Sequence, residues 1–304
     1  MAKTLAKTLS RIAADMGQSQ DWGEVAAYIP ELAQVPKEQF AIAAVTADGQ
    51  LYSAGAAQVR FSVQSITKVF TLAIALGRSG DQLWQRVGRE PSGSAFNSIV
   101  QLEQENGHPR NPFVNAGAIV TTDEVLAGRA PKEALAEILG FFRAAAEDED
   151  IHINKSVARS ETAHGHRNFA LAHFLASCGN LKNPPEMTLG TYFHHCAIEM
   201  TVEQLAKAGR FLIGAGAGPR LVSQQRVRRL NALMMTCGHY DGSGDFAYRV
   251  GLPAKSGVGG GILTIVPGKA SVAVWSPGLD ENGNSKLGTA AMERLAHEMN
   301  WSVF

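Results

Sequence analysis

Apolar and polar residues follow each other along this chain with two distinct spacings. Near the N-terminus, apolar side chains at Leu5, Leu9, Ile12 and Met16 have helical spacing, which predicts an amphipathic helix. Two pairs of short apolar runs are instead typical of strands joined by turns: 40–46 and 50–53 around Asp48-Gly49, and 262–266 and 270–275 around Pro267-Gly268-Lys269. We therefore expect an antiparallel strand pair toward each end of the chain.

Helical spacing dominates the residues between these strand pairs. The apolar pattern and its capping residues predict helices at 65–77, 119–126, 131–142, 168–179, 201–212 and 223–238, and a last helix at 285–299. This order predicts an α+β fold, with an antiparallel sheet built from both chain ends, flanking helices and a helical lobe. We expect a single domain over residues 1–304, with a sheet lobe at about 20–62 and 250–304 and a helical lobe at about 77–240.

The composition is that of a globular protein with a sizeable core and no charge bias. Of 304 residues, 45% are hydrophobic and 18% are charged, and 28 Lys and Arg residues balance 28 Asp and Glu residues. This balance gives no reason to expect binding to nucleic acid or to an anionic membrane. Lys3, Lys7 and Arg11 precede no apolar signal-peptide core, and no later run approaches about 18 consecutive apolar residues. We expect a soluble, cytoplasmic protein without nucleic-acid or membrane partners.

The cysteines and histidines show no pattern typical of a disulfide framework or a metal site. Cys178, Cys196 and Cys237 are far apart, and each lies in or at the end of a predicted helix, so buried free thiols are expected. His194-His195-Cys196 looks like part of a zinc site, but adjacent helical side chains point in different directions. The acidic run at 147–150 is expected to be a solvated linker. We predict neither a metal nor a cofactor.

Ser65 and Lys68 form a Ser-x-x-Lys pair at the start of the helix predicted at 65–77. Their spacing places both side chains on one face of a helix, within reach of each other. A serine hydroxyl needs a base to take its proton, and apolar surroundings lower the pKa of a lysine so that it can be that base. The helix N-terminus also favours developing negative charge. The alternative is a capping serine followed by an unrelated lysine.

A glycine-rich segment, 251–261, precedes the C-terminal strand pair. Its Lys255-Ser256-Gly257 resembles the Lys-[Thr/Ser]-Gly strand of penicillin-binding proteins and serine β-lactamases, whose backbone amide completes an oxyanion hole beside the serine helix. A phosphate-binding loop is the alternative, but here the glycines precede a strand and not a helix. The Ser-x-Asn or Tyr-x-Asn element of that architecture is absent, because Tyr240-Asp241-Gly242 lacks the asparagine. This departure argues against β-lactam chemistry.

Six sequence blocks in order closely resemble the glutaminase family, which includes bacterial glutaminases and the catalytic domain of animal glutaminases. The blocks are Tyr28-Ile29-Pro30, Gln64-Ser65-x-x-Lys68, Glu90-Pro91-Ser92-Gly93, Asn111 to Ala118, Arg167-Asn168 and Gly251 to Val258. The resemblance covers residues from about 20 to 300 and implies a β-lactamase- or transpeptidase-like fold. It also implies hydrolysis of L-glutamine to L-glutamate and ammonia without a metal or cofactor, by a homo-oligomer that is a dimer or a tetramer.

The same resemblance implies roles for individual residues. Ser65 would be the nucleophile that forms a glutamyl-serine intermediate, Lys68 its general base, and the amides of Ser65 and Val258 the oxyanion hole. Tyr240 would pass a proton to the leaving ammonia, and Tyr28 would shape the pocket beside it. The implied substrate-binding set is Gln64, Ser65, Asn115, Glu161, Asn168, Tyr192, Tyr240 and Val258. Its one carboxylate, Glu161, lies in a polar segment between two predicted helices and suits the substrate ammonium.

Two other functions compete with glutamine hydrolysis. A penicillin-recognising serine peptidase or esterase, or a β-lactamase-like hydrolase, on the same fold would need a periplasmic signal and a Ser/Tyr-x-Asn element, and neither is found. A non-catalytic binding or scaffold protein is the third possibility. The intact Ser65, Lys68 and Tyr240 argue against a loss of chemistry.

Overall fold

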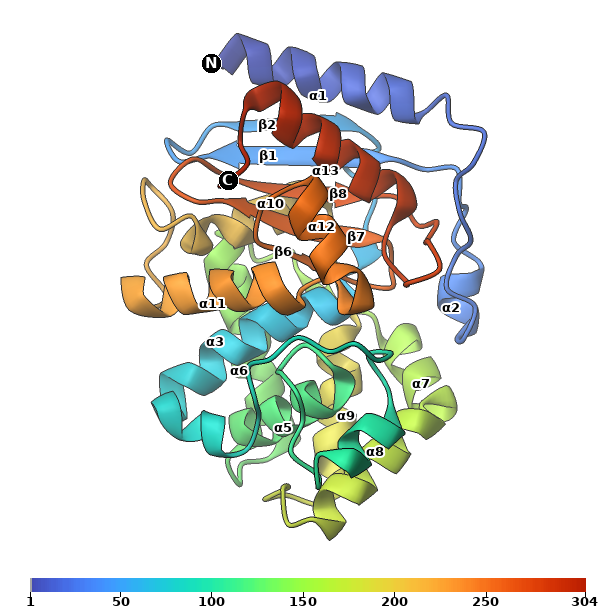
Figure 1. Ribbon diagram of the computed structural model, residues 1–304, viewed down its shortest axis with the longest axis vertical. Coiled ribbons are helices and arrows are strands. Elements are labelled where there is room, and N and C mark those ends of the chain that lie inside the picture. The colour runs from blue at the N-terminus through green and yellow to red at the C-terminus, as the bar shows by residue number, and fades with distance from the viewer. Residues whose placement is uncertain (1) are drawn as a thin grey trace.

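The computed structural model describes residues 2–304, and its largest sheet joins the two ends of the chain (Figure 1). This antiparallel sheet has five strands in the order β2-β1-β8-β7-β6. The strands are β1 Ala41–Thr46, β2 Leu51–Gly55, β6 Ala254–Ser256, β7 Gly261–Val266 and β8 Ala270–Trp275. Ala41 pairs with Trp275, so the N-terminal and C-terminal hairpins lie side by side. Both predicted hairpins and the α+β fold class are confirmed.

Helices cover both faces of this sheet. α1 (Ala2–Met16) and α13 (Lys286–Met299) pack on one face, and α10 (Val202–Ala208) packs on the other, against β1 and β8. Successive residues of β1 point to opposite faces, so Ile42 joins the apolar cluster under α1 and α13 while Ala43 joins the cluster on the other side. The predicted amphipathic first helix is confirmed.

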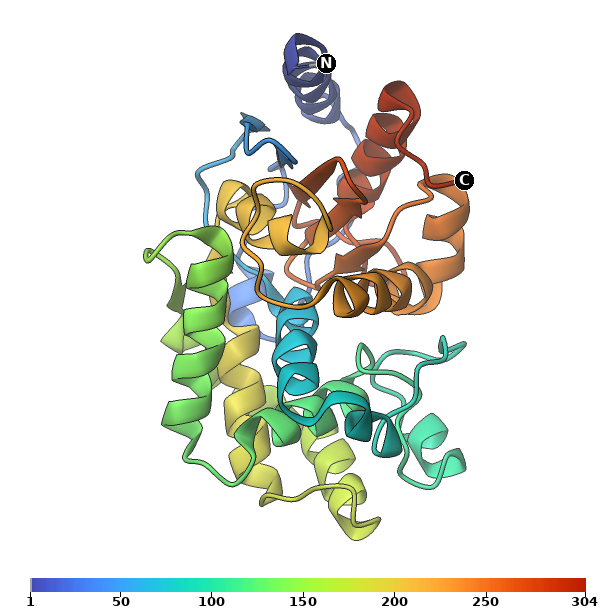
Figure 2. The same cartoon turned by 90° about the vertical axis from the view of Figure 1, so that its left-hand side faces the viewer.

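α3 (Thr67–Ser79) lies at the centre of the molecule (Figure 1, Figure 2) and contacts α5, α6 and α11 among the remaining helices. These helices are α2 Pro30–Ala33, α4 Ile99–Gln104, α5 Asn115–Leu126, α6 Pro131–Ala146, α7 Lys155–His164, α8 His166–Ser177, α9 Pro185–Cys196, α11 Gln224–Cys237 and α12 Ser243–Arg249. A second, three-stranded sheet leads into α3, and its strands in spatial order are β3 Phe61–Ser62, β5 Ile198–Met200 and β4 His152–Ile153.

The serine helix differs from its prediction at both ends. A 3₁₀ turn over Gln64–Ile66 precedes it, so the α-helix begins only at Thr67. Gln64, the first residue of this turn, has a φ of 49°, outside the α-helical region. At the other end the helix continues through Gly77 and stops at Gly80, whose φ is 56°. A glycine inside a helix costs only about 1 kcal/mol relative to alanine, so Gly77 does not have to end the helix.

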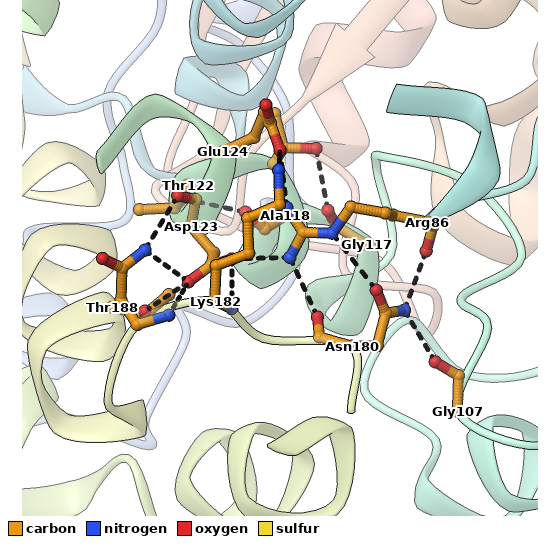
Figure 3. Close-up of polar contacts among 12 residues, drawn as sticks. Arg86, Gly107, Gly117, Ala118, Thr122, Asp123, Glu124, Asn180, Lys182 and Thr188 are labelled. Atoms are coloured by element: carbon orange, nitrogen blue, oxygen red, sulfur yellow. Dashed lines mark hydrogen bonds and ion pairs between the residues drawn. The ribbon is translucent and has the colours of Figure 1, made fainter. Parts of the chain in front are cut away.

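A buried carboxylate anchors the C-terminal end of α5 (Figure 3). Asp123 is fully buried and accepts hydrogen bonds from the backbone amides of Lys182 and Asn183, both at 2.9 Å. It also pairs with the Arg86 guanidinium at 2.5 Å, and Arg86 reaches the carboxylate of Glu124 at 2.6 Å. These contacts fasten the α8–α9 connection and the loop after α3 to α5.

The described residues also bear on membrane spans, metal ligands and free thiols. Among residues 2–304, no helix combines the length and the apolar character that crossing a membrane requires. Within the same range, no group of three or more His, Cys, Asp and Glu side chains could hold a metal ion. Cys196 and Cys237 are buried free thiols, whereas Cys178 is exposed, so its predicted burial is wrong. Cys178 follows the last residue of α8, where the chain turns at the surface.

Candidate active site

Ser65 lies in the 3₁₀ turn between β3 and α3 and is 7% exposed. The backbone before it is held by a hydrogen bond of 2.9 Å from the Val63 amide to the Ile198 carbonyl of β5. Gln64 has a φ of 49°, a conformation that residues with a large side chain rarely adopt. Such strain persists only where surrounding contacts impose it.

Two glycines in the loop after β6 pack directly against this turn. A Cβ atom on Gly257 or on Gly259 would collide with a backbone carbonyl of residues 62–63. The loop therefore lies on the backbone of the serine turn, and Val258 lines the same cavity as Ser65. Within residues 2–304, neither the Ser65 amide nor the Val258 amide donates a hydrogen bond to another protein group. Both amides are therefore free to donate a hydrogen bond to an oxygen atom of a ligand.

Lys68 follows Ser65 by one helical turn, and its amine is buried. The residue is 1% exposed, and its Nζ donates to Asn115 Oδ1 at 2.7 Å and to the Phe113 carbonyl at 3.1 Å. Burial lowers the pKa of Lys68 to about 8. A neutral amine has two N–H groups and one lone pair. Because both N–H groups are engaged, the lone pair is the part left to accept a proton.

Tyr240 brings a phenol to Ser65 from the segment before α12. Burial raises the pKa of Tyr240 to about 12, although hydrogen bonds with Ser65 and Ser256 act in the opposite direction. The phenol is therefore protonated at neutral pH and can donate a proton. Lys255 is fully buried and its Nζ lies 4.4 Å from the centre of the Tyr240 ring. Burial, assisted by the charge of Lys68, lowers the pKa of Lys255 well below 10.5.

Glu161 brings a buried carboxylate to the site. It is 4% exposed and accepts a hydrogen bond of 2.7 Å from the Tyr28 hydroxyl, which also lies 3.5 Å from Gln64 Oε1. Burial raises the pKa of Glu161. Among residues 2–304, no lysine or arginine forms an ion pair with it, because Arg159 and Arg167 donate to other groups. The carboxylate therefore faces the site without a cationic protein partner.

Glu161 and Asn168 lie inside helices and not at the positions predicted for them. The segment around Glu161 is not a polar connection but part of α7, whose N-terminus is capped by the Asn154 side chain. Helix α8 begins at His166, so Asn168 does not open it. The capping asparagine was the available signal, but the few apolar residues of α7 conceal its helical period. The bend at Gly165 lets both helices line the same cavity.

Asn115, the first residue of α5, connects three other site residues. Its Nδ2 donates to Asn168 Oδ1 at 2.9 Å, and its Oδ1 accepts from Lys68 Nζ at 2.7 Å and from the Tyr192 hydroxyl at 3.3 Å. Burial raises the pKa of Tyr192 well above 10, so this hydroxyl stays a donor. Asn115 therefore ties the amine beside Ser65 to the polar wall of the cavity.

These side chains surround a cavity of about 260 Å³, a volume suited to a small molecule. Of the catalytic and substrate-binding residues expected from the sequence, Lys68 and Tyr240 do not line it, and the others do: Tyr28, Gln64, Ser65, Asn115, Glu161, Asn168, Tyr192 and Val258. The lining also contains residues to which the sequence gave no role: Phe96, Asn97, His164, Gly165, Arg167 and Cys196. Lys255 was missed as a site residue as well, although it lies in the Lys-Ser-Gly motif.

The sequence of the chain matches a protein family along nearly its whole length. The family model described as Glutaminase matches residues 23–304. Proteins named glutaminase from Mesorhizobium japonicum and Rhodopseudomonas palustris are 61% and 60% identical to the chain, cover 100% and 99% of it, and are each covered over 98% of their own length. The chain belongs to the glutaminase family. The resemblance found in the sequence is thereby confirmed, and this glutaminase is an amidohydrolase that acts on glutamine.

Solved structures also match this glutaminase over its whole length. A probable glutaminase has a TM-score of 0.95 and 38% identity, covering 100% of this chain and 99% of that one. A probable glutaminase from Bacillus subtilis has a TM-score of 0.88 and 32% identity, with 100% and 97% covered. The protein Mglu in its L-glutamate binding form has a TM-score of 0.92 and 36% identity, with 99% of this chain and 69% of that one covered. These relatives support glutamine hydrolysis over the penicillin-recognising alternative.

Proposed function

We propose that this glutaminase hydrolyses L-glutamine to L-glutamate and ammonia through a glutamyl ester on Ser65. The observation that carries the proposal is the buried Glu161 carboxylate, which faces the cavity of Ser65 without a cationic partner among residues 2–304. A free amino acid supplies the missing cation, its ammonium, and glutamine also has a side-chain amide that can reach Ser65. The L-glutamate binding form of the similar protein Mglu supports the same choice of ligand.

In the proposed first half-reaction, Ser65 Oγ attacks the side-chain carbonyl carbon of glutamine while the neutral Lys68 amine takes the serine proton. The carbonyl oxygen becomes an anion, which the amides of Ser65 and Val258 stabilise. The carbon–nitrogen bond then breaks. Tyr240 passes a proton to the departing nitrogen, which leaves as ammonia, and the proton on Lys68 restores the phenol. The raised pKa of Tyr240 keeps the phenol protonated at neutral pH and makes its phenolate a strong base, which readily takes back the proton held by Lys68.

In the proposed second half-reaction, a water molecule attacks the glutamyl ester and loses a proton to the Lys68 amine. The ester bond breaks, Lys68 returns its proton to Ser65 Oγ, and the new carboxylic acid group of glutamate loses its proton to solvent. The Asn168 amide group is suited to donate to the substrate α-carboxylate, and the Tyr192 hydroxyl would donate to it in place of Asn115 Oδ1. Gln64 and Tyr28 lie beside the Glu161 carboxylate that would hold the ammonium. The α-carboxylate of the substrate would thus face hydrogen-bond donors, and its ammonium would face a carboxylate.

The covalent intermediate is the part to test first. An electrophilic glutamine analogue should label the peptide that contains Ser65, and Ser65→Ala should abolish turnover while the protein stays folded. Label on a cysteine would contradict the serine mechanism. Cys196 is the thiol to watch because it lines the cavity, although burial raises its pKa to about 12 and so keeps it protonated. Mass spectrometry of the labelled peptides separates the two outcomes.

We also propose that residues 1–304 form a single catalytic domain, that it works in the cytoplasm, and that it assembles into a dimer or a tetramer. Support for the single domain comes from the sheet, whose strands are drawn from both ends of the chain. Analytical ultracentrifugation of the purified protein tests the assembly, because a species of 32.4 kDa that persists at every concentration would be a monomer.

A further inference from the structure

The loop between β8 and α13 presents one buried amide toward the active site. Asp280 Oδ1 accepts from the backbone amides of Asn282 and Asn284, each at 2.9 Å, and the Asp280 amide donates to the Asn284 carbonyl at 2.8 Å. The loop is therefore closed on itself. Asn284 is 3% exposed, whereas Asn282 on the same loop is exposed.

Both ends of the Asn284 amide are engaged, and the two partners come from different elements. Its Oδ1 accepts from Ser256 Oγ of β6 at 2.6 Å, and its Nδ2 donates to the His239 carbonyl at 3.3 Å. His239 immediately precedes Tyr240, and the Ser256 carbonyl lies 3.5 Å from the Tyr240 hydroxyl. One side chain thus bridges the strand beside the Tyr240 hydroxyl and the backbone that carries Tyr240.

The backbone at Tyr240 needs such a restraint. Tyr240 has a φ of 54°, a left-handed conformation that is unfavourable for an aromatic residue and persists only when its surroundings impose it. The asparagine loop also packs near the site, since a Cβ on Gly283 would lie 3.9 Å from the Tyr240 ring and from the Val258 side chain. The loop therefore lies beside the group that would protonate ammonia and beside the residue whose amide would bind the oxyanion.

We propose that Asn284 is a positioning residue, which holds Tyr240 and the β6 end in the geometry required for ammonia to leave. This inference rests on the proposed role of Tyr240. Asn284 does not line the cavity, so it acts through Tyr240 and not on the substrate. If Asn284 only stabilised the fold, replacing it would lower the stability of the protein and leave the turnover of the folded molecules unchanged.

Steady-state kinetics of two matched variants separates these roles. Asn284→Ala should lower kcat by roughly 10- to 100-fold, the size of effect that a misplaced catalytic group produces, with KM within about threefold of the parent value. Asn282→Ala, on the same loop but exposed, should change neither constant. If Asn284→Ala fails to fold, the isosteric Asn284→Asp, which keeps the acceptor for Ser256 and loses the donor to His239, should show the same loss in kcat. Parent-like kcat in a folded Asn284 variant overturns the proposal.

A double-mutant cycle tests whether Asn284 acts through Tyr240. Enough enzyme is used to follow ammonia release far below the parent rate. In a Tyr240→Phe background, adding Asn284→Ala should cost less than about threefold, because the group it positions is already gone. If the two substitutions instead lower the rate by independent factors that multiply in the double variant, the proposed coupling is refuted. A Tyr240→Phe enzyme with parent activity would instead refute the proposed role of Tyr240, so the two failures are distinguishable.

Discussion

The Lys68 amine is suited to act as a base because it is buried and both of its N–H groups are engaged. Lys68→Arg keeps a cation but removes the base, since a guanidinium does not lose its proton in proteins. We expect this variant to lose at least roughly 100-fold in kcat/KM, the lower bound for removing a general base, measured by ammonia release. Circular dichroism and thermal unfolding serve as controls for folding. Ordinary activity in a folded variant would remove Lys68 from this role.

The lowered pKa of Lys68 also predicts how activity depends on pH. Only the neutral amine accepts a proton, so kcat/KM should increase with pH up to and through about 8, where the amine loses its proton. Because the charge of Lys68 also acts on Lys255, the apparent pKa of the rising limb belongs to both lysines. The measurement is kcat/KM from about pH 6 to about pH 9 on enzyme shown to be folded at each pH. A flat profile would contradict the assignment.

Glu161 is expected to make this enzyme selective for amino acids. A charge-assisted contact with the substrate ammonium is worth about 1.5–3 kcal/mol, and a buried charge left unpaired costs more. Glu161→Gln should therefore lower kcat/KM for glutamine by roughly 10- to 1000-fold. The variant should also discriminate poorly against an analogue without the α-amino group, which the parent should reject. Kinetics with both substrates on both proteins decides, and unchanged discrimination would mean that Glu161 does not bind the ammonium.

Secondary structure elements were predictable where the signal is local. The hairpins of β1–β2 and β7–β8 follow from apolar runs that flank Asp48-Gly49 and Pro267-Gly268-Lys269, and their register needs no distant residue. The start of α3 was missed because residues 64–66 form a 3₁₀ turn, against which the loop around Gly257 packs from nearly two hundred residues away in the sequence. Helical period alone therefore placed the helix at Ser65, two residues too early.

The anchor of α5 makes a prediction about stability (Figure 3). Asp123→Ala removes a fully buried carboxylate and leaves the Arg86 guanidinium, 13% of whose side chain is exposed, without this partner. Breaking a buried ion pair costs about 3–5 kcal/mol, so the free energy of unfolding should fall by about this amount, measured with denaturant. The matched control is Asp81→Ala at the exposed pair with Arg229, where at most about 1 kcal/mol is expected. Equal effects of the two substitutions would contradict an anchoring role.

The complete site could be predicted only in part, because it is assembled across the whole molecule. Motif blocks pointed to Ser65 and Lys68, and the family resemblance supplied residues as far apart as Tyr28 and Val258, all of which border or adjoin one cavity. No local pattern distinguishes Lys255 as a neighbour of Tyr240, because their contact depends on how β6 packs against the segment before α12. Asn284 is hidden for the same reason.

His195 links the stability of the whole molecule to pH. It is fully buried between Thr67 of α3 and Thr122 of α5, and burial lowers its pKa from 6.5 to about 3. As pH falls below about 6.5, the unfolded chain binds a proton that the folded protein excludes, so His195 reduces the free energy of unfolding by up to about 1.4 kcal/mol per pH unit.

Denaturant unfolding at about pH 7.5 and about pH 5 should show this loss. Every protein compared keeps two other shifted groups: His239, whose pKa burial also lowers and which acts in the same direction, and Glu161, whose raised pKa acts with the opposite sign. His195→Gln should lose less stability over this interval than the parent, whereas His108→Gln, at an exposed histidine, should lose as much as the parent. Equal losses in all three proteins would mean that His195 does not provide the linkage.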